Sequence, residues 1–130
     1  MLIRIDPDDA RPIYRQVADE IRTLIAAGKL REGAALPPVR QVAADLGVNL
    51  NTIATAYREL QDEGLISIRH GSGAVVNERT PSRADKQAAA RELRTPLRTA
   101  LAQLVLAGLP ANEILNIVAA ELRGLTKGAR

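Results

Sequence analysis

The chain has no cysteine, no phenylalanine and no tryptophan, and its only histidine is His70. Without cysteine it has no disulfides, no thiolate metal sites and no cysteine nucleophile, and one histidine is a poor basis for a metal site. Aromatic residues make up only 2% of the chain, which argues against stacking platforms for RNA or single-stranded DNA. No apolar run approaches the roughly 20 residues of a membrane span, and the first residues lack a signal-peptide apolar region. We therefore expect a cytoplasmic protein with no cofactor and no metal.

What the chain does contain is aliphatic and charged. Its 130 residues suit one ordinary domain, or one small domain with an attached assembly element, and a content of 46% hydrophobic and 25% charged residues is typical of a globular chain. The net charge of +3 is unevenly spread: residues 1–78 carry nine Lys or Arg and eleven Asp or Glu, and residues 79–130 carry nine and four. Bulk charge therefore says nothing about the first part, but two of its segments, residues 48–58 and 65–77, contain no acid.

Apolar periodicity predicts three helices and a hairpin in the first part. We expect helices over residues 12–27, with an apolar face that begins at Ile13, and over residues 38–46. A turn at Gly47 leads to a third helix, which Asn49 caps and Gly64 ends. A strand from residue 65, a tip at residues 70–73 and a return strand then form a wing, while residues 29–36 are expected as a loop.

The second part is predicted to be helical and to pair with another copy. After a polar linker at residues 77–82, helices are expected over residues 84–107 and 110–123, with a kink or restart at Pro96 and glycine ends at Gly108 and Gly124. Their apolar stripes exceed what one helical hairpin can bury, which favours a homodimer. The residues expected at the dimer interface are Leu93, Leu97, Leu101, Leu104, Ile114, Ile117, Val118 and Leu122.

The basic run of the second part has two interpretations. It consists of Arg79, Arg83, Lys86, Arg91, Arg94 and Arg98. A solvated face is the simpler interpretation, and contact with phosphates is the other.

Several short motifs resemble one family as a set. They are Pro12-x-Tyr14, Gly28-x-Leu30, Leu36-Pro37, Arg40, Leu46-Gly47-Val48, Asn51-Thr52, Tyr57, Gly64-Leu65-Ile66 and Gly71-x-Gly73. Together they resemble, over residues 3–78, the DNA-binding domain of the GntR family of bacterial transcription regulators. The short helical tail is similar to that of the YtrA subfamily, in which two helices serve dimerisation.

A helix-turn-helix of this kind places its second helix in the major groove and its wing on an adjacent backbone or minor groove. The residues expected to contact DNA are Arg40, Asn49, Asn51, Thr52, Thr55, Arg58, Arg69, His70 and Gly71. The resemblance to the GntR family supports DNA contact by Arg40, by the start of the third helix and by the wing tip. Simpler roles remain open: Arg40 as a partner of Asp45, Asn49 as a cap only, and Arg58 as a partner of Asp62. Leu50 and Ala54 stand where some family members have base-reading arginines, so base specificity is not carried over.

The expected fold is mainly α, with a winged helix-turn-helix and its small β-hairpin over residues 1–78 and a helical dimerisation region over residues 79–130. The expected function is a homodimeric, sequence-specific transcription regulator, a repressor of a pseudo-palindromic operator. The resemblance also implies control of a neighbouring transporter operon. The alternative is a winged-helix module that binds protein rather than DNA, which would carry acids or large apolar residues on the exposed face of the third helix. An enzyme would need a set of titratable groups that this chain does not offer.

Overall fold

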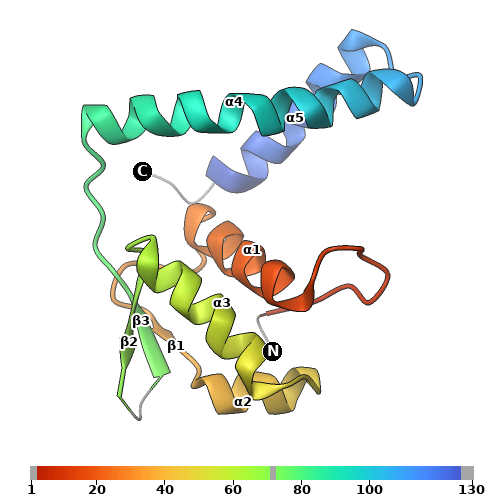
Figure 1. The fold of residues 1–130 in the computed structure, drawn as a ribbon. Helices are drawn as coiled ribbons and strands as arrows, with labels where there is room; N and C mark the ends of the chain where they lie inside the picture. Colours follow the sequence, from red (N-terminus) through yellow and green to blue (C-terminus); the bar gives the residue numbers. More distant parts are fainter. Residues whose placement is uncertain (1–2, 71–72, 127–130) are drawn as a thin grey trace. The chain divides into compact units, whose positions relative to one another are not determined.

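The computed structural model describes residues 3–70 and 73–126. Within these ranges the elements follow one another as α1 (Ile13–Ala26), β1 (Ala35–Leu36), α2 (Val39–Leu46), α3 (Leu50–Asp62), β2 (Ile66–Arg69), β3 (Gly73–Val76), α4 (Arg83–Leu106) and α5 (Ala111–Thr126) (Figure 1). The chain divides into two compact units, one over Met1–Arg79 together with Leu125–Arg130 and one over Thr80–Gly124. A mainly helical architecture with a winged helix is thereby confirmed.

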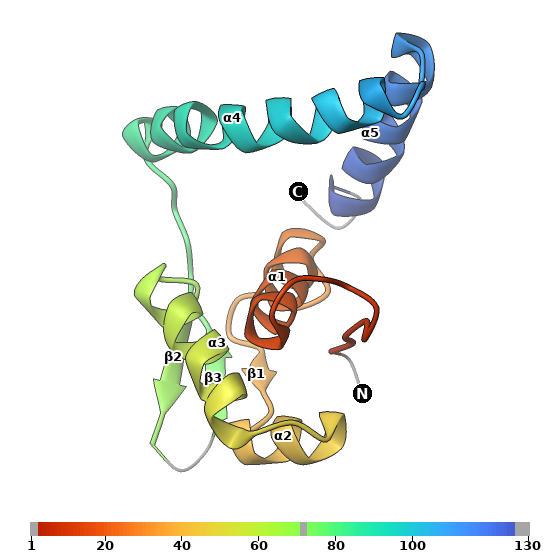
Figure 2. The same cartoon turned by 45° about the vertical axis from the view of Figure 1, so that its right-hand side comes forward.

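Helix α3 is the centre of the first unit. It packs against α1, α2 and β2 (Figure 2). Its apolar positions at helical spacing, Ile53, Ala56, Tyr57 and Leu60, have no exposed surface. From α1, Val17 and Ile21 enter the same core, but Ile13 is 38% exposed, so the apolar face of α1 does not begin there. The core is thus aliphatic, with one tyrosine ring inside it.

The wing belongs to a three-stranded antiparallel sheet with the order β1-β3-β2. In the hairpin, Ile66 pairs with Val76 and Arg69 with Gly73. The predicted hairpin is present, but Gly73, which was expected in its tip, is the first residue of β3, and β2 begins at Ile66 rather than at Leu65. The third strand corrects the loop predicted over residues 29–36, because Ala35 and Leu36 pair with Val75 and Ala74. Two residues are too few to show a strand period, so this strand is defined only by its partner.

The turns of the first unit carry the helix ends that the sequence indicates. Gly47 adopts a φ of 69° and its N–H donates to the carbonyls at the end of α2. Asn49 then caps α3, since its Oδ1 accepts the Asn51 N–H at 2.8 Å. A left-handed glycine after one helix and an Asn cap before the next produce the tight turn of a helix-turn-helix.

In the second unit, α4 runs without a break through Pro96, so the expected restart there is wrong. The helix starts instead at a capping box, in which the Ser82 Oγ accepts the Asp85 N–H and the Asp85 carboxylate accepts the Ser82 N–H. A missing proline N–H removes one hydrogen bond, and the good helix formers on either side continue the helix. The predicted end at Gly124 is also wrong, because α5 continues to Thr126.

Few side chains of the second unit are shielded from solvent. No residue of α4 is buried, and on α5 only Ile114 is, at 7% exposure. Over residues 3–70 and 73–126, no helix is both long and apolar enough to cross a membrane.

Candidate nucleic-acid interface

The first turns of α3 present short polar side chains. Asn49 and Asn51 are exposed, and Thr52 and Thr55 are half-buried. Because the Asn49 Oδ1 is used in the cap, its Nδ2 amide is the group that can donate to an external acceptor. The Thr55 hydroxyl donates to the Asn51 carbonyl at 2.8 Å. This end of α3 therefore offers side-chain amide and hydroxyl groups at the positive end of the helix dipole, which suits phosphates and base edges.

Arg58 lies one turn further along α3 and is exposed. Its Nη2 donates to the Thr55 Oγ1 at 3.4 Å, so the guanidinium leans toward the start of the helix. No ion pair joins Arg58 to Asp62, or Arg40 to Asp45, in the part of the chain that the structure describes. The simpler alternative for Arg40 and Arg58, pairing with these local acids, is therefore not observed among the described residues, and both side chains are available to an external anion.

The structure brings Arg40 together with the wing. A cleft of about 330 Å³ lies between the start of α2 and the β2–β3 hairpin. Its lining residues are Pro38, Val39, Arg40, Ile68, Arg69, His70 and Gly73. Three exposed basic side chains, Arg40, Arg69 and His70, surround an apolar floor. Gly71, the remaining wing residue expected to contact DNA, lies outside the described residues.

A hydrogen bond from α3 fixes the backbone that carries Arg40. The Tyr57 hydroxyl donates to the Pro37 carbonyl at 2.7 Å, three residues before Arg40. Burial raises the pKa of Tyr57 to about 12, so the hydroxyl keeps its proton and stays a donor across the physiological range. Pro37 and Pro38 restrict the backbone at the acceptor, which makes the position of the α2 start well defined.

Close backbone packing also fixes the wing next to the start of α2. Gly73 has a φ of 83°, and a Cβ added to it would lie 2.6 Å from the Leu36 carbonyl oxygen. Only glycine permits this approach. On the other side of the hairpin, the Gln61 Oε1 accepts the Ile68 N–H at 2.8 Å, which ties β2 to α3.

These contacts were not predicted as positioning contacts, although one signal was present. Tyr57 stands in an otherwise aliphatic stripe, and a buried hydroxyl needs a hydrogen-bond partner. The spacing of Gln61 and Gly73 carries no comparable signal, because both contacts depend on how α3, β1 and the hairpin meet in space.

The acids of α3 lie at its other end and are partly paired. Arg22 of α1 bonds Asp19 at 2.7 Å and Glu59 at 2.9 Å, and it also pairs with Glu63. Hydrogen bonds to Glu63 and Glu59 raise the pKa of Arg22. The network fastens α1 to the C-terminal half of α3 and places negative charge there, while residues 48–58 stay free of acids.

Comparison with known proteins decides the family. The model of "Bacterial regulatory proteins, gntR family" matches residues 13–76. A solved structure of YtrA from Sulfolobus acidocaldarius, a GntR-family transcription factor, is 38% identical with a TM-score of 0.62, and the alignment covers 78% of this chain and 99% of that one. This chain belongs to the GntR family.

Two further similar proteins bear on the subfamily and the interface. The transcriptional repressor YtrA of Bacillus subtilis is 38% identical over 59% of this chain and 59% of its own length, so the chain spans less than two thirds of that relative. The DNA-binding domain of AraR, solved in complex with operator ORX1, is 29% identical with a TM-score of 0.50 and covers 56% of this chain and 90% of that one. The matches to two YtrA proteins agree with the YtrA subfamily, and the relatives are regulators, as expected, rather than enzymes.

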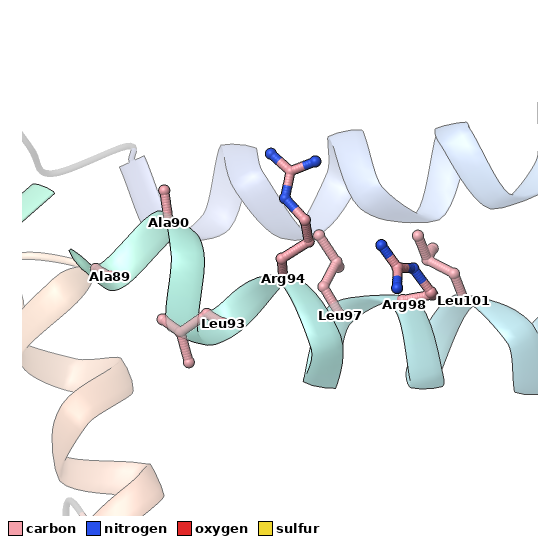
Figure 3. A pocket seen from close by; sticks show the side chains of 7 residues that line it. All are labelled: Ala89, Ala90, Leu93, Arg94, Leu97, Arg98 and Leu101. Carbon is pink, nitrogen blue, oxygen red and sulfur yellow. The ribbon is translucent and has the colours of Figure 1, made fainter. Parts of the chain in front are cut away.

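Outside the GntR winged helix, α4 presents an apolar groove. The groove has a volume of about 630 Å³. Its lining residues are Ala89, Ala90, Leu93, Arg94, Leu97, Arg98 and Leu101 (Figure 3). Leu93 and Leu97 are 62% and 56% exposed. Of the other residues expected at a dimer interface, Ile117 and Leu122 are exposed, Leu101, Leu104 and Val118 are half-buried, and Ile114 is buried.

Proposed function

We propose that this chain is a sequence-specific, DNA-binding transcription regulator that represses from a pseudo-palindromic operator as a homodimer. In this proposal residues 1–78 read DNA and residues 79–130 join two copies. The observation that carries it is the grouping of Arg40 with the wing residues Arg69 and His70 around one cleft, in a unit whose α3 starts without acids.

The proposed contacts follow from the donors that each element presents. Arg40 offers a planar fork to a guanine edge or a phosphate, and the start of α3 offers Asn51 and Thr52 to base edges. Arg69, His70 and Gly71 form the wing that enters an adjacent groove, and Arg58 reaches a phosphate from the next turn of α3. The operator complex of AraR supports this assignment, because its DNA-binding domain resembles the first unit.

The dimer is proposed on the apolar face of the two C-terminal helices. Burying an aliphatic side chain is worth about 1.5–3 kcal/mol, so the exposed leucines of α4 favour association with a second copy. Two winged units related by a two-fold axis require half-sites about 10 base pairs, or a multiple, apart. The repressor YtrA of Bacillus subtilis supports repression as the direction of control. A neighbouring transporter operon, implied by the YtrA resemblance, is the proposed target.

The test is a titration of the full chain against a duplex selected by the protein from a random-sequence library, at fixed salt. Arg40→Ala and Asn51→Ala should each weaken binding by about 1–3 kcal/mol, because each removes one donor set. Arg31→Ala removes an exposed cation from the loop before β1 and should leave binding unchanged. Full affinity in both interface variants would contradict the proposed surface, and failure to select any duplex would favour the protein-binding alternative.

Assembly and control are tested separately. Leu97→Asp should turn a dimer into a monomer in sedimentation equilibrium and weaken binding to the two-half-site duplex more than to a single half-site. A monomeric wild-type chain would contradict the dimer. Footprinting of the adjacent promoters, with and without the protein, tests the transporter operon.

A further inference from the structure

The cations of α4 lie on one side of the helix. At about 100° per residue, Arg83, Lys86, Arg91, Arg94 and Arg98 fall within an arc of roughly 140°. The leucines Leu97, Leu101 and Leu104 share this arc, but they lie later in the helix than Arg83, Lys86 and Arg91. The two acids of the helix, Asp85 and Glu92, fall on the opposite side. All five cations are exposed. A surface that serves only solubility mixes both signs, so a face of one sign needs another explanation.

Local structure does not account for these cations. In residues 3–70 and 73–126 none of the six ion pairs involves α4, and Asp85 is used by the capping box at Ser82. Arg83 and Lys86 also stand in the first turns of the helix, where the positive end of the helix dipole disfavours positive charge. Cations kept at an unfavourable position without a local partner indicate an external anion.

The cations of α4 belong to the part of the chain that carries the excess of positive charge. Residues 1–78 have an excess of acids over bases, whereas residues 79–130 hold nine bases and four acids. Attraction to a polyanion is therefore concentrated outside the winged helix. Only three residues, Thr80–Ser82, separate Arg79 from α4, so an anion held by the first unit is at high effective concentration near these cations, whatever the orientation of the two units.

We propose that the cations of α4 that do not line the apolar groove, Arg83, Lys86 and Arg91, bind backbone phosphates of duplex DNA outside the base pairs read by the winged helix, whereas Arg94 and Arg98 line the groove proposed for the dimer. The inference rests on the proposed function. The contact is made to phosphates, so it adds affinity without adding sequence preference and it depends on salt. Its ligand is DNA that flanks the operator.

The experiment compares two duplexes and two matched variants of the full chain. One duplex is the selected operator alone, and the other extends it on each side by about one helical turn, ~10 base pairs, of arbitrary sequence. The test variant is Arg83→Gln/Lys86→Gln/Arg91→Gln, whose three changes are at residues that do not line the apolar groove. The control, Arg4→Gln/Lys29→Gln/Arg31→Gln, removes the same charge from the first unit.

Wild type and control should bind the extended duplex more tightly than the short one, and the test variant should bind both equally. The slope of log K against log salt on the extended duplex should fall by about 0.9 for each phosphate that the test variant no longer neutralises, and should not fall in the control. Sedimentation of the variants confirms that assembly is unchanged; if the triple variant dissociates, Arg83→Gln/Lys86→Gln should still reduce the flank dependence.

The outcomes separate the two proposals. A wild-type chain that selects no duplex overturns the proposed function. A wild-type chain that binds its operator, with flank dependence and salt slope equal in the test and control variants, overturns only the role of α4. Binding of the wild type, but not the test variant, to vesicles containing phosphatidylglycerol, together with an unchanged flank dependence, would assign the face to a membrane surface and likewise overturn its role on DNA.

Discussion

Val17, Ile53 and Leu60 of the winged unit have no exposed surface, whereas Leu93 and Leu97 of α4 keep 62% and 56% of theirs. The two groups are similar in chemistry, and both recur at helical spacing. In the first unit three helices and a small sheet meet around the stripes, so the core is complete within one chain. In the second unit two helices leave most of their apolar surface in water. An apolar stripe therefore predicts burial, but which chain provides the partner depends on how many elements are at hand.

Truncation of one leucine in each unit is expected to give the largest difference in stability between the two units. Leu60→Ala should destabilise the winged unit by about 2–5 kcal/mol, because it opens a cavity in a closed core. Leu97→Ala should leave the unfolding of the winged unit unchanged and lower only the dimer association constant. Thermal unfolding followed by circular dichroism, with sedimentation on the same samples, measures both. Equal loss of thermal stability in the two variants would contradict the view that the winged unit has a closed core and that the leucines of α4 do not contribute to it.

A smaller effect is expected from the close contact between the wing and β1. Gly73→Ala should destabilise the winged unit by more than Gly64→Ala, its control. Both positions have a positive φ, which costs a residue with a Cβ about 1–2 kcal/mol, but only at Gly73 would the Cβ meet backbone, at 2.6 Å. Gly73→Ala should also weaken operator binding, since the wing moves relative to Arg40. Denaturant unfolding compares the stability of the two variants, and titration compares their affinity for the operator. If Gly73→Ala and Gly64→Ala could not be distinguished, the backbone around Gly73 would be able to shift and accommodate the added Cβ.

A loss of about 1 kcal/mol in stability is expected from Tyr57→Phe, which removes the hydroxyl but keeps the ring. Because the hydroxyl positions the backbone before Arg40, Tyr57→Phe should weaken operator binding in the wild-type background and not in an Arg40→Ala background. A double-mutant cycle measures this coupling. If the two substitutions had additive effects on operator affinity, Tyr57 would contribute to the core but would not position Arg40.

The same substitution changes the dependence of stability on pH. The pKa of Tyr57 is raised from 10.0 to about 12 in the folded chain, so its contribution is complete below pH 10 and is lost as the pH rises from 10 to 12. The free energy of unfolding of wild type should fall more steeply over this interval than that of Tyr57→Phe. Parallel curves would contradict the assigned burial of the hydroxyl.

Much of the winged unit follows from local rules that the sequence displays. Gly47 and Asn49 mark the turn between α2 and α3, and the hairpin returns one residue earlier than predicted, at Gly73 rather than Ala74. Strand β1 and the Gly73 contact could not be predicted, because each is defined by a partner distant in the sequence. At Pro96 a local rule was overruled by the helix-forming residues around it. Of the residues expected to contact DNA, the placement of Arg40 beside the wing required the fold, and their roles remain predictions.

Pro96 also has a mechanical consequence. A proline in the middle of α4 has no N–H for the carbonyl of Glu92, one turn earlier, so the helix resists bending least at this point. In a dimer joined through α4 and α5, bending there changes the separation of the two winged units at little cost. If the proposed dimer forms, we therefore expect it to bind half-sites whose spacing differs slightly from that of the selected operator. Pro96→Ala should stiffen α4, and the range of half-site spacings that the dimer binds should then narrow.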